Sequence, residues 1–133
     1  MSSGRTLLEI INLTKSFGGL VAVDGLNFSV KEQEVVGIIG PNGSGKTTVL
    51  NLISGVFRPT AGNIYLSGQQ ISQKSAHHIA RTGVARTFQL VRVLPGLSVI
   101  DNVIAGAVFG HRRRCTQQAH THAVSLLQRV GLE

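Results

Sequence analysis

The chain has 133 residues and a mass of 14.1 kDa, so we expect one domain and exclude a two-domain enzyme with separate cofactor and substrate lobes. Thirteen Lys and Arg residues against six Asp and Glu give a formal net charge of +7, which favours an anionic partner such as a nucleotide, a nucleic acid or a lipid headgroup. The single cysteine, Cys115, excludes an internal disulfide and indicates a reducing compartment. The longest apolar stretch, residues 97–110, is too short to span a bilayer, so a membrane role requires a spanning partner.

In chain order, the hydrophobic pattern first predicts two half-buried strands, over residues 7–13 and 26–30, joined through a turn at Phe17-Gly18-Gly19. Residues 35–39, Val-Val-Gly-Ile-Ile, have no polar face, which predicts a central strand covered on both sides. A glycine-rich loop follows at once. After it, the pattern predicts a helix over residues 46–53 that ends at Ser54-Gly55.

The rest of the chain alternates short elements with turn signals. We expect a turn at 59–62, strands over 63–66 and 84–88, and helices over 75–81, 98–110 and 116–130. Ser98 and Asp101 have the spacing of a capping box, and Gly131 stands where a helix usually ends. The sequence therefore predicts a folded α/β domain.

One stretch of nine residues carries the most specific chemical signal. It reads Gly40-Pro41-Asn42-Gly43-Ser44-Gly45-Lys46-Thr47-Thr48. This order satisfies the phosphate-loop pattern of a glycine, four spacers, a glycine, a lysine and a Ser or Thr, and it lies between a predicted buried strand and a predicted helix. The sequence therefore predicts a binding site for a nucleoside triphosphate here.

The residue types suit triphosphate binding. Glycines allow successive backbone N–H groups to turn toward crowded phosphate oxygens, and a helix N-terminus adds the positive end of its dipole. We expect Lys46 to reach the β- and γ-phosphates, the Thr47 hydroxyl to ligate Mg²⁺, and Thr48 to be a candidate for the α-phosphate. The alternative is a glycine-rich turn with a capping threonine. The loop alone leaves open a transporter motor, a kinase or a GTPase.

Segments on both sides of the loop resemble the ATP-binding subunit of ATP-binding-cassette (ABC) transporters, over essentially the whole chain. Residues 15–18, Lys-Ser-Phe-Gly, look like the aromatic loop of that family, which implies that Phe17 stacks on the adenine of ATP; a core position in a hairpin is the alternative. Residues 83–89, Gly-Val-Ala-Arg-Thr-Phe-Gln, are similar to the segment that ends in the family's Q-loop glutamine. The resemblance implies that Gln89 contacts Mg²⁺ or the attacking water.

The resemblance also implies the fold class and the domain organisation. The expected fold is α/β: a P-loop NTPase-like core with an N-terminal antiparallel β layer over residues 1–89, and the start of a helical subdomain over residues 90–133, incomplete at the C-terminus. ATP and Mg²⁺ are the implied cofactors.

Within the family, three segments are similar to importers of branched-chain amino acids and related amides or urea: residues 17–23, 85–89 and 97–103. A subunit of this kind powers import, while a binding protein and the membrane subunits select the solute. The implied partners are a second ATP-binding subunit and membrane-spanning permease subunits, and no nucleic acid. The implied location is cytoplasmic, peripheral on the inner face of the cell membrane.

Other family motifs have only imperfect matches in the chain. Residues 66–70, Leu-Ser-Gly-Gln-Gln, nearly spell the signature but lack its fourth-position glycine and precede Gln89, so we interpret them as a strand end with a turn. Residues 20–24 end in Asp24 but lie before the phosphate loop and continue with a glycine where a catalytic glutamate is needed. The sequence thus predicts a chain that stops before the signature, the Mg²⁺-binding aspartate, the catalytic glutamate and the switch histidine. Whether it is an ATPase remains open at this point.

Two further functions are alternatives. A P-loop small-molecule kinase shares the loop and differs by having an acceptor site. A basic nucleic-acid-binding module is suggested by Arg112-Arg113-Arg114, although no aromatic residues are interleaved with these arginines. Metal binding by Cys115, His120 and His122 is disfavoured, because their spacing does not match a closed tetrahedral site.

Overall fold

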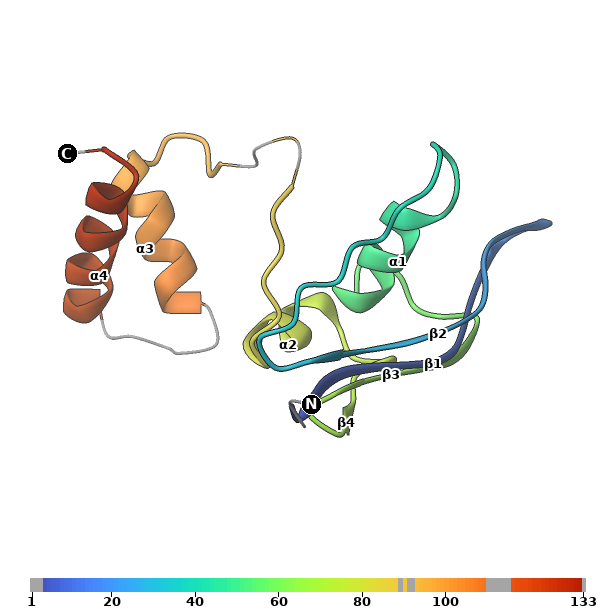
Figure 1. Cartoon of the computed structure of the whole chain (residues 1–133). Helices are drawn as coiled ribbons and strands as arrows, with labels where there is room; N and C mark the ends of the chain where they lie inside the picture. The colour runs from blue at the N-terminus through green and yellow to red at the C-terminus, as the bar shows by residue number, and fades with distance from the viewer. Residues whose placement is uncertain (1–3, 89, 91–92, 110–115, 133) are drawn as a thin grey trace. The chain divides into compact units, whose positions relative to one another are not determined.

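The computed structural model describes residues 4–88, 90, 93–109 and 116–132. The chain divides into two units, residues 1–79 and residues 80–133, with the boundary inside the short helix at residues 76–81 (Figure 1). The first unit contains the phosphate loop and an antiparallel sheet, and the second contains a pair of helices.

The sheet of the first unit contains four antiparallel strands in the order β2-β1-β3-β4. Their bounds are β1 (Thr6–Phe17), β2 (Leu20–Lys31), β3 (Ala61–Leu66) and β4 (Gln69–Gln70). The β1–β2 hairpin turns at Gly18, whose φ of 57° suits a residue without a Cβ. The predicted N-terminal antiparallel layer is therefore confirmed, and both of its long strands extend further than the pattern indicated.

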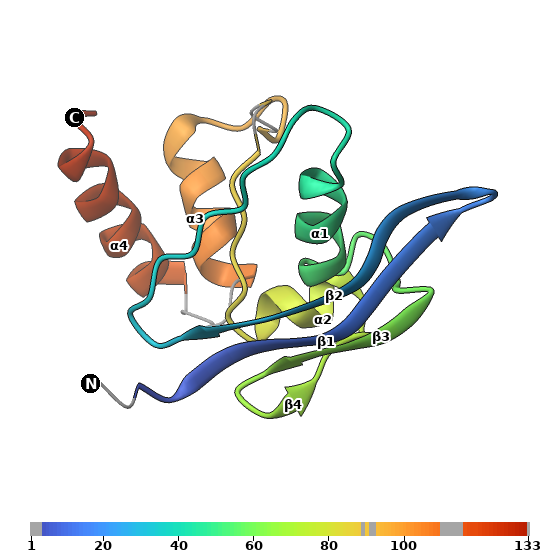
Figure 2. The same cartoon turned by 45° about the vertical axis from the view of Figure 1, so that its right-hand side comes forward.

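Two short helices, α1 (Lys46–Ile53) and α2 (Ala76–Arg81), lie on one side of this sheet (Figure 2). The core contains Ile10 and Ile64, which are opposite each other in the β1–β3 register, together with Val49 and Leu52 of α1. Ile79 of α2 is also buried. The apolar side chains of α1 thus recur three residues apart and cover the inner face of the sheet.

Helix α1 begins and ends where the sequence predicted. After Ser54, Gly55 adopts a φ of 73°, and the Val56 N–H donates to the Asn51 carbonyl at 2.9 Å. This is the geometry of a helix ended by glycine. The Ser67-Gly68 step, with φ values of 49° and 79°, joins β3 to β4, so the interpretation of residues 66–70 as a strand end with a turn is confirmed.

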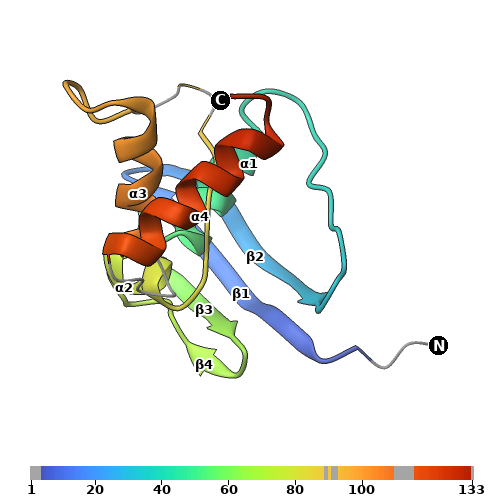
Figure 3. The same cartoon turned by 90° about the vertical axis from the view of Figure 1, so that its left-hand side faces the viewer.

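The second unit contains α3 (Val99–Phe109) packed against α4 (Thr116–Arg129), which runs obliquely to α3 in Figure 3. Ala119 and Ala123 are fully buried, and their spacing of four residues places them on the same face of α4. The predicted cap at Ser98 is confirmed, because the Asp101 N–H donates to Ser98 Oγ at 3.2 Å. The Asp101 carboxylate accepts from the Ser98 hydroxyl at 2.6 Å, whereas the acid of a full capping box accepts from the backbone N–H of the cap residue. Gly131, with a φ of 76°, follows the end of α4 as predicted.

Two predicted strands are wrong. Residues 35–39 and residues 84–88 have no strand structure and pair with no described strand. Val35 and Ile39 are each 96% exposed. The physical reason is that a strand without a polar face forms only where neighbours complete its hydrogen bonds and layers cover both of its faces, and no described segment does so for residues 35–39.

Among the residues that the structure describes, no helix combines the length and the apolar character needed to cross a bilayer.

Candidate phosphate-binding site

The phosphate loop connects the extended residues 35–39 to α1. Gly43 and Gly45 have φ values of 83° and 84°, a region that residues with a Cβ rarely adopt. The Ser44 N–H donates to the Pro41 carbonyl at 3.3 Å, which closes the loop on itself. A Cβ on Gly40 would lie 2.7 Å from Ser44 Oγ, so the Ser44 side chain packs directly against the backbone of Gly40.

The Lys46 ammonium group donates into this loop. Its Nζ lies 2.7 Å from the Gly40 carbonyl oxygen and 2.5 Å from the Pro41 carbonyl oxygen, and 3.4 Å from Ser44 Oγ. The loop therefore surrounds the Lys46 ammonium group, which is held by hydrogen bonds to uncharged carbonyl and hydroxyl oxygens. Phosphate oxygens accept stronger, charge-assisted hydrogen bonds than carbonyl oxygens do, so this ammonium group suits an anionic ligand.

The N-terminus of α1 is open to a ligand. Its N-cap residue is Gly45, which makes no side-chain capping bond, and its first turn contains no acidic residue. The first backbone N–H groups of a helix have no intrahelical partner, and they carry the positive end of the helix dipole. Thr47 is exposed and Thr48 is half-buried within this first turn. The residues present thus fit a triphosphate with a bound Mg²⁺ ion.

Strand β2 positions this helix end. Gly45 packs so closely on β2 that a Cβ at this position would overlap the Ala22 carbonyl oxygen, and it would lie 3.6 Å from Val23 Cγ2. Val23 is itself buried. Because Gly45 has no side chain, its backbone lies directly against β2. The sheet therefore holds the N-terminal end of α1 in place.

Phe17 lies at the end of β1 and is 41% exposed, so its side chain is not a core residue of the hairpin. Its ring contacts Phe57 edge to face, with centroids 5.2 Å apart. Phe57 belongs to none of the motifs recognised in the sequence. The only signal in the sequence is that Phe57 is an aromatic residue just after the end of α1. Its contact with Phe17 could not be predicted, because the two residues are far apart along the chain.

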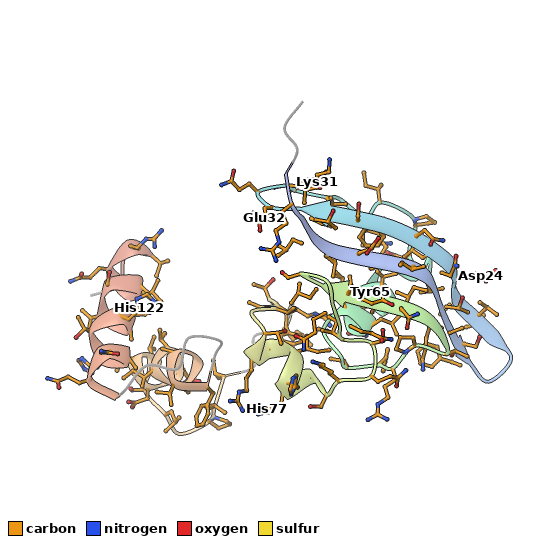
Figure 4. The ribbon with its side chains drawn as sticks, turned by 90° about the horizontal axis from the view of Figure 1, so that it is seen from below. Asp24, Lys31, Glu32, Tyr65, His77 and His122 are labelled. Atoms are coloured by element: carbon orange, nitrogen blue, oxygen red, sulfur yellow. The ribbon has the colours of Figure 1, made fainter. Side chains whose placement is uncertain are left out.

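Several of the other candidate residues named from the sequence fall on positions that the structure does not describe. Gln89 lies outside the described residues, as do Cys115 and Arg112-Arg113-Arg114. Asp24 is exposed on β2 and His122 lies on α4 (Figure 4). Within the described part of the chain, no three His, Cys, Asp or Glu residues are grouped to hold a metal ion.

Comparison with known sequences gives the family. The family model described as "ABC transporter" matches residues 23–133, which is most of the chain. The chain belongs to the ABC transporter family. The phosphate loop and α1 described above lie inside the matched range.

Two bacterial relatives in this family are similar over nearly the whole chain. The high-affinity branched-chain amino acid transport ATP-binding protein BraF of Pseudomonas aeruginosa is 41% identical over 144 residues, covering 96% of this chain and 55% of the relative. The corresponding protein LivG of Escherichia coli is 40% identical over 141 residues, with the same coverage. The chain thus spans about half the length of these ABC relatives.

Solved ABC cassettes share the fold. A nucleotide-free ATP-binding cassette from an ABC transporter matches with a TM-score of 0.70 and 32% identity, over 88% of this chain and 46% of that one. A dimeric bacterial ABC transporter cassette matches with a TM-score of 0.82 and 27% identity, over 96% of this chain and 58% of that one. A related dimer is described as bound to ADP and Pi. These matches confirm the predicted α/β, P-loop NTPase-like fold class.

Proposed function

We propose that this chain is the N-terminal, nucleotide-binding part of an ABC subunit that powers the import of branched-chain amino acids or similar small solutes. The observation that supports this most directly is the phosphate loop, which curls around Lys46 at the open N-terminus of α1. The named activities of BraF and LivG support the solute class. Family membership favours this function over a P-loop kinase or a nucleic-acid-binding module.

In the proposed complex, each part of the site has one task. Backbone N–H groups of the loop, at Gly40 and residues 42–45, and of the first turn of α1 donate to the phosphate oxygens of ATP; Pro41 has no N–H and contributes only to the curvature of the loop. Lys46 exchanges the Gly40 and Pro41 carbonyl groups for the β- and γ-phosphates. Thr47 provides a hydroxyl ligand for Mg²⁺, which supplies charge neutralisation when bound, and Gln89 is the second proposed ligand.

The remaining site residues orient the nucleotide. Thr48 contacts the α-phosphate and Phe17 stacks on the base. The exposed fraction of the Phe17 ring, 41%, leaves surface available for a flat apolar partner. Stacking of this kind adds affinity and keeps the triphosphate directed into the loop.

Binding of ATP with Mg²⁺, measured by isothermal titration calorimetry on the folded chain, tests this proposal. Lys46→Ala removes the only side-chain cation of the loop, and we expect affinity to fall about tenfold to a hundredfold, as for the loss of a hydrogen bond to a charged group. Lys31→Ala, at an exposed position on β2, is the matched control and leaves affinity unchanged. A wild-type chain that is folded and gives no heat with ATP and Mg²⁺ contradicts the proposal.

Hydrolysis by this chain alone is expected to be very slow. Its 133 residues contain no convincing match to the signature, the Mg²⁺-binding aspartate, the catalytic glutamate or the switch histidine. We therefore predict ATP binding with little or no phosphate release in a continuous phosphate assay. Steady turnover in the wild-type chain that disappears in Lys46→Ala would contradict this prediction.

In a transporter, the proposed partners are a second ATP-binding subunit and membrane-spanning permease subunits, with the subunit on the cytoplasmic, inner face of the membrane. An open groove of about 740 Å³ between α3 and α4, lined mainly by apolar side chains that include Val99, Ile100 and Leu127, is consistent with a protein contact in the second unit. Closure of two subunits over ATP would couple binding energy to transport, because only the closed pair gains those contacts.

A further inference from the structure

The aromatic side chain at the end of β1 is held by a second ring. Phe17 and Phe57 lie with their centroids 5.2 Å apart and their planes at 74°, an edge-to-face pair. Such pairs have a preferred geometry because the ring edge is positive and the ring face is negative. The orientation of the Phe17 ring is therefore linked to the position of Phe57.

A lysine completes this cluster. The Lys15 Nζ atom lies 4.9 Å from the centroid of the Phe17 ring and 5.9 Å from that of Phe57. At these distances an ammonium group is attracted to the negative face of a ring. The same Nζ atom donates to the Arg58 carbonyl oxygen at 2.9 Å, so the cation is itself fixed in place.

Hydrogen bonds from backbone and side-chain groups attach the segment that follows Phe57 to the end of β1. The Ser16 N–H donates to Thr60 Oγ1 at 3.0 Å, and the Thr60 N–H donates to the Thr14 carbonyl oxygen at 2.9 Å. Together with the Lys15 bond to Arg58, three contacts connect residues 58–60 to residues 14–16. The segment next to Phe57 is thus fixed to β1 by hydrogen bonds.

We propose that Phe57, supported by Lys15, is a positioning residue that holds the Phe17 ring in the orientation in which it stacks on the base of the bound nucleotide. This inference rests on the proposed function. A ring that is oriented before binding loses less rotational freedom when a base stacks on it, so preorganisation strengthens the binding of the base. The phosphates are bound by a different part of the chain and do not depend on this cluster.

The test separates base binding from phosphate binding. Calorimetry on the full chain compares ATP with inorganic tripolyphosphate, both with Mg²⁺, for the wild type, Phe57→Leu, Phe17→Leu and the double variant. We expect Phe57→Leu to weaken ATP binding about threefold to tenfold, the range expected for loss of an aromatic pair, and to leave tripolyphosphate binding within twofold. Phe57 should have no further effect once Phe17 is leucine.

Further variants keep the test informative if Phe57→Leu disturbs folding. Phe57→Tyr keeps the ring and should retain wild-type ATP affinity, whereas Lys15→Met keeps the side-chain stem, removes the charge and should weaken ATP binding alone. Val56→Ala removes apolar surface from the neighbouring position, which is 51% exposed, and should change neither affinity.

Three outcomes overturn the inference. Equal weakening of ATP and tripolyphosphate by Phe57→Leu would mean that Phe57 is only structural. An undiminished effect of Phe57→Leu in the Phe17→Leu background would mean that it acts independently of the stacking ring. A wild-type chain that binds tripolyphosphate no more weakly than ATP would remove the base-stacking role while leaving the phosphate site intact, and a chain that binds neither would refute the proposed function as well.

Discussion

Gly45 combines two constraints at a single residue. Its φ is 84°, and a Cβ at this position would overlap the Ala22 carbonyl oxygen of β2. The positive φ suits the turn of the phosphate loop into α1, and the close approach places the open helix end directly on the sheet. The motif pattern identifies this glycine from the sequence, but its contact with Ala22 depends on the packing of β2.

Gly45→Ala is therefore predicted to destabilise the first unit. A left-handed backbone costs a residue with a Cβ about 1–2 kcal/mol, and the overlap with Ala22 adds to that cost. Urea unfolding followed by circular dichroism measures the change. Gly37→Ala is the matched control, because a Cβ there meets no atom within 4 Å. Equal stability of the two variants would show that the close approach has no energetic consequence.

Ser72 is a second single residue with a specific structural role, in this case within the core. It is 5% exposed, and its Oγ accepts a hydrogen bond of 2.8 Å from the Ile64 N–H. Strand β4 is only two residues long, so this side chain satisfies a backbone group of β3 that a longer neighbouring strand would otherwise pair. The sequence pattern had indicated nothing about this serine.

We predict that Ser72→Ala lowers the free energy of unfolding by about 1–3 kcal/mol, because the buried Ile64 N–H loses its partner. Thermal or urea unfolding provides the measurement. Ser29→Ala, at an exposed position on β2, should change stability by less than about 0.5 kcal/mol. If both variants unfold at the same urea concentration, the bond to Ile64 does not contribute to stability.

At the scale of elements, helices were predicted more accurately than strands. Helix α1 was predicted at its observed bounds, α3 begins one residue after the predicted cap at Ser98, and α4 ends two residues before Gly131. Caps, glycine stops and helical periodicity are local signals, contained within a few residues. Strand formation depends on distant partners, which explains why residues 35–39 and 84–88 were predicted incorrectly.

At the scale of the whole molecule, the exposed apolar residues 35–39 are a liability. Val35 and Ile39 are each 96% exposed, and the extended backbone around them has no strand partner among the described residues. An apolar segment of this type is able to pair with a copy of itself, which promotes aggregation. The high net charge of +7 opposes self-association through repulsion.

Replacing both side chains by lysine, Val35→Lys with Ile39→Lys, is predicted to reduce aggregation severalfold in static light scattering. The free energy of unfolding should change by less than about 0.5 kcal/mol, because exposed positions are replaced. The double variant Ser29→Lys with Gln69→Lys adds the same charge at exposed polar positions of the sheet. If this control reduces aggregation equally, the effect comes from charge alone and not from the apolar segment.

The sequence by itself determined the parts that depend on neighbouring residues: the phosphate loop around Lys46, the helix that follows it, the β1–β2 hairpin and the family to which the chain belongs. Only the tertiary structure decided that residues 35–39 have no strand partner among the described residues and that the Phe57 ring contacts Phe17. The reason is physical. Loop curvature and helix ends are governed by hydrogen bonds and φ angles within a few residues, whereas strand pairing and ring packing require groups that the chain brings together only on folding.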